Sequence, residues 1–299
     1  MFFKNLVLYR FTPPPGFTPE GLAERLEPYA FRSCGGLEPF SQGFESPFGP
    51  TGETLVHAAA GRTLLCLRRE ERLLPPAVVR EATEARVAEI EANEFRTVRR
   101  KERARVRDEL TFELLPRAFT RSVRTFAYLC TQTGWLAVDA AAAARAEEAA
   151  NLLAQAAPEL RIAPYAPDAV PGQLLTGWLR ERHPPAGFTL GDECELRDPQ
   201  HEGGIVRCQR QDLAAEEMRA HLRAHKEVRR LGLVFEEAVT FALTAELELK
   251  RLRYLGVEAL EEERSDLDPA ARFDADFAFM TATLAPLLER ILQIFGEAI

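Results

Sequence analysis

The chain has 299 residues, 46% of them hydrophobic and 28% charged, with a formal net charge of −8, which is typical of a globular protein with more than one core. Five widely spaced cysteines without a CxxC pair indicate a reducing compartment and argue against a structural zinc site. Polar residues and Pro286 interrupt the longest apolar stretches, so we expect no membrane span and a cytoplasmic protein.

Strand-like and helix-like segments alternate along the first half of the chain. Alternating apolar residues predict strands, and prolines followed by a 3.6-residue apolar period predict helix starts. The expected strands cover residues 6–11, 62–70, 125–131 and 135–140, and the expected helices cover residues 19–29, 76–95 and about 140–157. This order predicts an α+β fold.

The segment from residue 95 to residue 124 is strongly basic, with ten Arg/Lys against four Asp/Glu. Its arginines recur at helical spacing, which predicts an amphipathic helix with a cationic ridge beside an apolar face of Phe95, Val98 and Val106. The ridge contains Arg96, Arg99, Arg100, Arg103 and Arg107. A cationic ridge in an acidic protein favours a polyanionic partner. The alternative is an ordinary solvated helix face.

The second half of the chain resembles the first. Cys208 matches Cys66 at an offset of 142 positions, whereas Val228 matches Val123 at an offset of only 105. The first half therefore carries about 37 additional residues, which are the basic segment, and we interpret it as an arm inserted in a repeated scaffold. The alternative is that two generic strand-helix units align by chance.

Known catalytic motifs are absent from the sequence: it contains no GxxxxGK[ST], GxGxxG, GxSxG or HExxH. Asp274 and Asp276 could form the metal-binding carboxylate pair of a nuclease. They also precede an apolar segment from Phe277 to Phe295, where carboxylates commonly cap a helix, and we favour capping. We therefore expect no catalytic residue, cofactor or metal.

Four motifs in the same order along the chain resemble the bacterial recombination-associated RdgC family. They are Phe3-Lys-Asn-Leu6, Leu114-Leu-Pro-Arg-Ala-Phe119, Gly203-Gly-Ile-Val-Arg207 followed by Arg210-Gln-Asp-Leu213, and Arg272-Phe-Asp-Ala-Asp-Phe277. The resemblance implies a non-enzymatic, nucleoid-associated protein that binds single- and double-stranded DNA with little sequence preference. It also implies a ring-shaped homodimer that antagonises the RecA recombinase by occupying DNA.

The resemblance suggests a domain division and a set of contact residues. We expect a pseudo-symmetric, horseshoe-like protomer with a central domain (1–75 and 123–165), a basic arm (76–122) and a base domain (166–299), two of which pair into a ring. Phe119 would close the ring or wedge against the duplex. The DNA-contacting residues would be Arg96, Arg99, Arg100, Lys101, Arg103, Arg107, Arg117, Arg121, Arg210, Gln211 and Lys226.

Two other functions remain open on the sequence alone. One is a metal-dependent nuclease that uses Asp274 and Asp276. The other is a scaffold whose basic arm binds an acidic protein partner.

Overall fold

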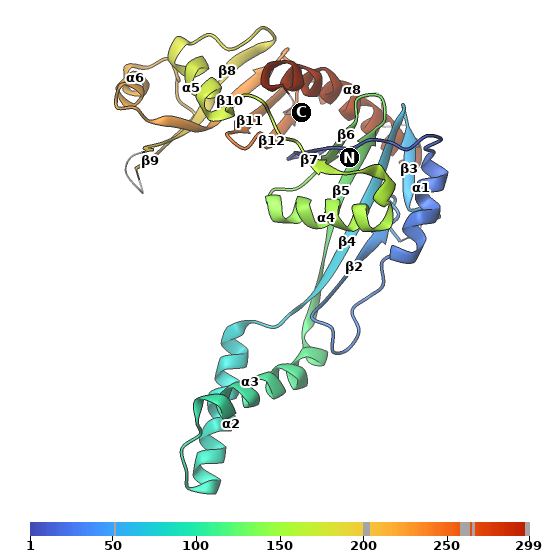
Figure 1. The fold of residues 1–299 in the computed structure, drawn as a ribbon, viewed down its shortest axis with the longest axis vertical. Coiled ribbons are helices and arrows are strands. Elements are labelled where there is room, and N and C mark those ends of the chain that lie inside the picture. The colour runs from blue at the N-terminus through green and yellow to red at the C-terminus, as the bar shows by residue number, and fades with distance from the viewer. Residues whose placement is uncertain (51, 200–203, 258–263, 265–266, 297–299) are drawn as a thin grey trace.

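The computed structural model describes residues 1–50, 52–199, 204–257, 264 and 267–296. It shows a mixed α+β chain with two antiparallel sheets, which confirms the expected fold class. Figure 1 shows a helical arm extending from one end of the first sheet, while the second sheet extends from the other end toward the same side, so the outline is a crescent.

The first sheet has the strand order β2-β4-β5-β6-β1-β7, with β3 also paired to β4. Its longest pair is β4 with β5, whose register runs from Arg62 opposite Cys130 to Leu73 opposite Phe119. The strands are β1 (Val7–Arg10), β2 (Phe40–Glu45), β3 (Val56–Ala59), β4 (Arg62–Leu73), β5 (Phe119–Cys130), β6 (Trp135–Val138) and β7 (Ala163–Pro164).

Two helices cover one face of this sheet, and short 3-10 turns follow each of them. Because successive strand residues point to opposite faces, Leu65 and Leu67 pack against these helices while Leu64 faces the other core. The elements are α1 (Pro19–Leu26), α4 (Ala143–Ala156), and the turns Glu27–Tyr29 and Pro158–Leu160. Thr18 caps α1 by accepting a hydrogen bond from the Gly21 N–H at 3.1 Å.

The arm is a helical hairpin between β4 and β5. It consists of α2 (Pro76–Glu94), α3 (Arg100–Leu114) and a 3-10 turn (Leu115–Arg117). Its buried apolar cluster is made by Val87, Val98, Val106 and Leu110. The hairpin therefore has a small core of its own, separate from the cores of the two sheets.

The second sheet has the strand order β12-β11-β10-β8-β9. Its strands are β8 (Phe188–Arg197), β9 (Ile205–Gln209), β10 (Glu227–Phe235), β11 (Val239–Thr244) and β12 (Leu249–Tyr254). The helices in this part of the chain are α5 (Pro171–Glu181), α6 (Glu216–Arg223) and α8 (Pro269–Phe295).

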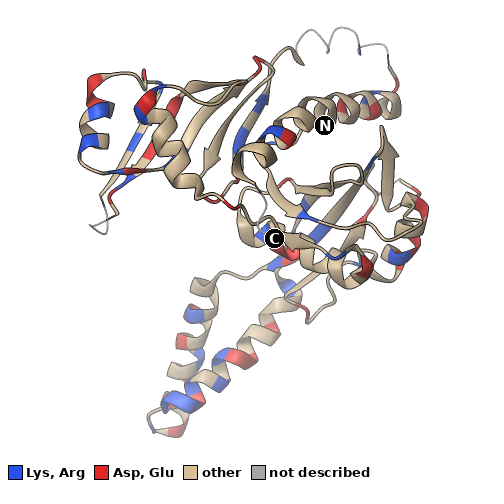
Figure 2. Ribbon diagram, turned by 45° about the horizontal axis from the view of Figure 1, so that its top comes forward, with Lys and Arg blue, Asp and Glu red and all other residues tan. Residues whose placement is uncertain are grey.

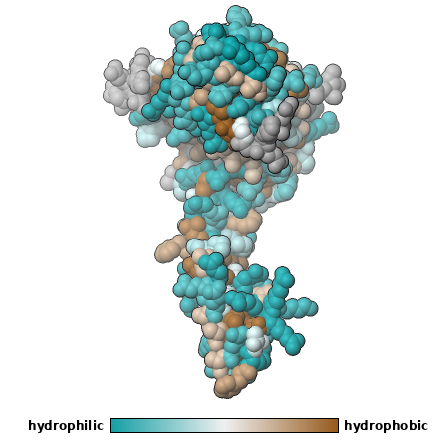
Figure 3. Space-filling view, turned by 90° about the vertical axis from the view of Figure 1, so that its left-hand side faces the viewer, coloured by the Kyte–Doolittle hydropathy of each residue, from teal (hydrophilic) through white to brown (hydrophobic). Residues whose placement is uncertain are grey.

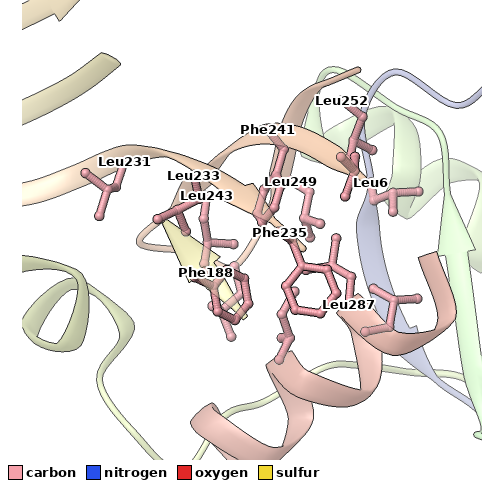
Figure 4. Packing of buried hydrophobic residues seen from close by; sticks show 14 of the residues in the cluster. Leu6, Phe188, Leu231, Leu233, Phe235, Phe241, Leu243, Leu249, Leu252 and Leu287 are labelled. Atoms are coloured by element: carbon pink, nitrogen blue, oxygen red, sulfur yellow. The ribbon is translucent and has the colours of Figure 1, made fainter. Parts of the chain in front are cut away.

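Helix α8 joins the two sheets through a shared core. Phe277, Leu284 and Leu287 are fully buried, in one cluster with Tyr128 of the first sheet and Leu231 of the second. Figure 4 shows apolar side chains, Leu243, Phe235 and Leu287 among them, packed between the strands of the second sheet and a helix. Among the described residues, α8 alone is long and apolar enough to cross a membrane, but its packing is that of a core helix.

The start of α8 corrects one sequence expectation. The helix begins at Pro269, and its N-cap is Asp268, whose carboxylate accepts hydrogen bonds from the N–H groups of Ala270 and Ala271, each at 2.9 Å. Asp274 and Asp276 lie inside the helix and therefore do not cap it. The buried apolar residues of α8 begin only at Phe277, because the first turns of the helix, from Pro269, are more exposed.

The strand order also corrects the alignment of the two halves. β9, which carries Cys208, is an edge strand, whereas β4, which carries Cys66, lies between β2 and β5. The strand at the position of β4 in the second sheet is β8, which lies between β9 and β10. Alignment of Cys208 with Cys66 is therefore wrong, because similar strand sequences do not specify which neighbour each strand pairs with.

Candidate nucleic-acid interface

The chain turns in the middle of the predicted cationic ridge. α2 ends at Glu94, Phe95 adopts a left-handed conformation (φ 52°), and α3 begins only at Arg100. Arg96 and Arg99 therefore lie outside a helix, and a single helical ridge of five arginines does not exist. Phe95 is 94% exposed, so it does not share the buried face of Val98 and Val106.

The hairpin also brings an acidic helix against the basic one. Because α2 contributes five glutamates, residues 76–117 contain ten Arg/Lys and nine Asp/Glu, a net charge of only +1. Figure 2 shows basic and acidic residues interspersed along the arm. The sequence window from residue 95 to residue 124 overstated the charge because it left out the helix that packs beside it.

Several of the expected DNA-contacting arginines are engaged by carboxylates of the same arm. Arg96 bonds Glu94 and Glu102, both at 2.6 Å, which raises the pKa of Arg96 and lowers the pKa of Glu102. Two more of the expected residues are paired, Arg103 with Glu84 (3.7 Å) and Arg107 with Asp108 (3.1 Å). Arg105, which was not an expected contact, pairs with Glu109 (2.9 Å). Exposed pairs of this kind contribute little to stability because water screens them, but they reduce the local positive charge.

Three consecutive cations at the start of α3 are different. Arg99, Arg100 and Lys101 are exposed, and no ion pair joins them to any residue that the structure describes. Arg99 is the N-cap of α3 but makes no side-chain capping bond. Cations at a helix N-terminus oppose the helix dipole and cost roughly 0.3–1 kcal/mol each. The position of these three cations therefore destabilises α3 and favours the binding of an anion near its start.

Phe119 and Arg117 lie where the arm rejoins the sheet. Phe119 is the first residue of β5 and is 85% exposed. β6 pairs with β5 only from Ala127 onward, so the segment from Phe119 to Thr125 has a strand on one side, β4, among the described residues. Arg121 in this segment is ion-paired with Glu71.

Arg72 positions this junction, and we did not anticipate it from the sequence. Its Nη1 donates hydrogen bonds to the carbonyl oxygens of Leu115 (3.1 Å) and Ala118 (3.3 Å), which flank Arg117. Its Nε and Nη2 bond the carbonyl oxygen of Gly35. The only sequence signal was a fourth arginine at the end of a strand that already contained three.

A second group of expected residues lies on the second sheet. Arg210 and Gln211 follow β9 and line a cleft with a volume of about 850 Å³. Arg251 and Arg253 of β12 line the same cleft and were not anticipated, although the Lys-Arg-Leu-Arg pattern of that strand was visible. Arg251 pairs with Glu193 at 2.5 Å, whereas Arg253 has no ion pair within the described part of the chain.

The structure does not bring all expected residues together. Lys226, just before β10, is half-buried and does not line the cleft of Arg210 and Gln211. No arm residue lines that cleft either. The candidate contacts thus form two groups, one on the arm and one on the second sheet, and Figure 1 shows the arm and the second sheet at opposite ends of the first sheet.

The two aspartates proposed as a nuclease pair have separate partners. The Asp274 carboxylate lies 3.0 Å from His57 Nε2, and Asp276 is ion-paired with the Met1 amino group and Arg264. No group of three or more His, Cys, Asp or Glu side chains suited to a metal ion occurs among the described residues. The arrangement gives each aspartate a structural role in holding α8 and does not join them in one site.

Comparison with known proteins shows similarity over the whole chain. Residues 1–298 match the family described as "Putative exonuclease, RdgC". The chain is 44% identical to "Recombination-associated protein RdgC" of Halorhodospira halophila, 41% to that of Aeromonas hydrophila and 40% to that of Tolumonas auensis. Each match covers 99% of this chain and 98% of the relative.

Proposed function

We propose that this chain, which belongs to the RdgC family, binds single- and double-stranded DNA without sequence preference and limits the access of the RecA recombinase to DNA. The observation that carries the proposal is the presence, on both the arm and the second sheet, of exposed cations that have no ion pair with any described residue. Arg99, Arg100 and Lys101 lie on the arm, and Arg210 and Arg253 line the cleft of the second sheet.

The charge distribution suggests how such a protein would hold DNA. Arginines and lysines that replace the counterions of phosphates provide affinity that depends on salt and hardly on sequence. The remaining surface is acidic overall, since the chain has a net charge of −8, and it would repel DNA from other faces. The two cationic groups would therefore define where DNA passes.

A homodimeric ring is the second part of the proposal. Two crescents related by a two-fold axis can meet at both ends, and each contact is then isologous. One such contact could form at β5, where the edge from Phe119 to Thr125 has no paired strand on the β6 side among the described residues and the Phe119 ring is exposed. The proposed domain division follows this geometry, with the arm at one contact and the base domain at the other.

We expect Phe119→Ala to weaken the dimer by about tenfold or more, because burial of a phenylalanine side chain stabilises by roughly 1.5–3 kcal/mol. Sedimentation velocity over a dilution series measures the dissociation constant. Leu73→Ala, at the residue opposite Phe119 on β4, is a control for a general loss of apolar surface. An unchanged dimer with weakened duplex binding would instead assign Phe119 to a DNA wedge.

Fluorescence anisotropy with random-sequence oligonucleotides at several salt concentrations tests DNA binding directly. We expect tight binding, a steep decrease of affinity with salt, and similar affinities for unrelated sequences. Absence of DNA affinity near physiological salt would instead favour a scaffold that binds an acidic protein.

The family description names an exonuclease, so cleavage is tested separately. Linear and supercoiled DNA are incubated with the protein and Mg²⁺ or Mn²⁺, and we expect both to remain intact because Asp274 and Asp276 are not brought into one site. Degradation that Asp274→Asn or Asp276→Asn abolished would establish the nuclease alternative.

A further inference from the structure

Phe95 lies in the turn of the arm hairpin, where neither its side chain nor its backbone conformation stabilises the fold. It is 94% exposed, more than any other large hydrophobic side chain among the described residues. It also has φ 52° and ψ 37° at the C-terminus of α2, a position that usually holds glycine or asparagine. A phenylalanine there neither packs nor relaxes the backbone, so its ring is available to a ligand.

The surroundings of Phe95 indicate what kind of ligand its ring would meet. The turn continues into Arg99, Arg100 and Lys101, which are exposed and have no ion pair within the described residues. Arg96 is held in place by Glu94 and Glu102. Figure 3 shows an arm that is mostly hydrophilic, with a small hydrophobic area at its far end. An isolated aromatic ring a few residues from exposed cations that lack an ion pair in the described part of the chain matches a nucleobase and its phosphates.

We propose that Phe95 stacks on a base of DNA whose bases are unstacked, while Arg99, Arg100 and Lys101 contact the neighbouring phosphates. The inference rests on the proposed DNA-binding function and adds a ligand class to it. Single strands, gaps and forks expose free base faces, whereas closed duplex DNA does not. The arm tip would therefore distinguish unpaired DNA from intact duplex.

A second copy of the chain is a less suitable occupant of this surface. A single phenylalanine offers far less area than the roughly 1,200 Å² or more that a stable interface buries. Two tips meeting across a two-fold axis would also bring together Arg99, Arg100 and Lys101 of both copies, which are six cations, and like charges repel. DNA offers a base for the Phe95 ring and phosphates for the three cations.

The test compares Phe95 variants on two kinds of DNA by fluorescence anisotropy. Stacking contributes about 1–3 kcal/mol per base, so Phe95→Ala is expected to weaken single-stranded oligonucleotides about 5- to 150-fold, with less than a twofold change on closed circular duplex. Phe95→Trp retains the affinity. Phe95→Gly loses it while relaxing the left-handed backbone, so the loss is not due to unfolding.

Photocrosslinking locates the stacked base. A single-stranded oligonucleotide with 5-iododeoxyuridine is irradiated with the wild-type protein, and mass spectrometry is expected to map the adduct to Phe95. Phe112→Ala, at another exposed phenylalanine of the arm, is the matched control and should leave both affinity and adduct unchanged.

The outcomes separate this inference from the proposed function. A wild-type protein that binds no DNA overturns the proposed function. Wild-type binding with an adduct elsewhere, and unchanged affinity for Phe95→Ala, overturns only the role of Phe95. If Phe95→Ala weakens the dimer but leaves the affinity for single strands unchanged, the ring makes a contact between two copies of the chain. If Phe95→Ala lowers the affinity for closed duplex as much as for single strands, the ring acts as a wedge. Either result contradicts base stacking.

Discussion

Replacement of Arg99, Arg100 and Lys101 by alanine is expected to weaken duplex DNA binding roughly 10- to 100-fold at about 0.1 M salt. Each phosphate contact contributes about 0.9 to the slope of log affinity against log salt, so the slope should decrease by up to about 2.7. The physical reason is that no carboxylate among the described residues is paired with these cations, so none has to be exchanged for a phosphate. Anisotropy titrations at four or more salt concentrations measure both quantities.

A matched triple variant isolates the effect of pairing from that of charge. Arg86, Arg105 and Arg107 lie on the same arm, and each has a carboxylate partner within 3.6 Å. Their replacement by alanine removes the same formal charge and is expected to change affinity much less. Equal losses for the two variants would show that overall arm charge, and not the free cations, determines binding.

Thermal unfolding provides the control for the first variant. Removal of cations from the N-terminus of α3 relieves an unfavourable interaction with the helix dipole. The melting temperature should therefore be unchanged or slightly higher, and lost DNA binding cannot be explained by a misfolded arm. A clearly lower melting temperature would contradict this account of the charge at the helix terminus.

Phe277→Ala is expected to reduce the free energy of unfolding by about 3–5 kcal/mol. Phe277 is fully buried on α8, and its ring lies 6.2 Å from that of Tyr128 and 5.9 Å from that of His57, both in the first sheet. The same core includes Leu231 of the second sheet. The cavity left by the ring would therefore destabilise both halves of the molecule together.

Urea unfolding followed by circular dichroism and by tryptophan fluorescence measures this effect. Trp135 reports on the first sheet and Trp178 on α5, and both are expected to unfold in one transition at a lower urea concentration. Phe112→Ala, at an exposed phenylalanine, is the control and should change stability by less than about 0.5 kcal/mol. Two separate transitions, with only one shifted, would contradict a shared core.

The sequence by itself determined the local elements of this protein. Alternation of apolar residues located β1, β4, β5 and β6, and prolines at helix starts located α1 and α2, because both signals depend on residues close together in the chain. The motif at Leu114–Phe119 and the three other motifs were sufficient to identify the family, which the whole-length similarity confirmed.

Only the tertiary structure decided which cations form ion pairs within the described part of the chain and which do not. The spacing of Arg96, Arg103 and Arg107 predicted one cationic ridge, but the hairpin turn at Phe95 broke the ridge and placed α2 beside α3, where Glu84 of α2 pairs with Arg103. The strand order likewise placed β9 at an edge, against the aligned repeat. Strand pairing and ion pairs such as Arg103 with Glu84 depend on residues brought together across the fold, and a local sequence pattern carries little information about them.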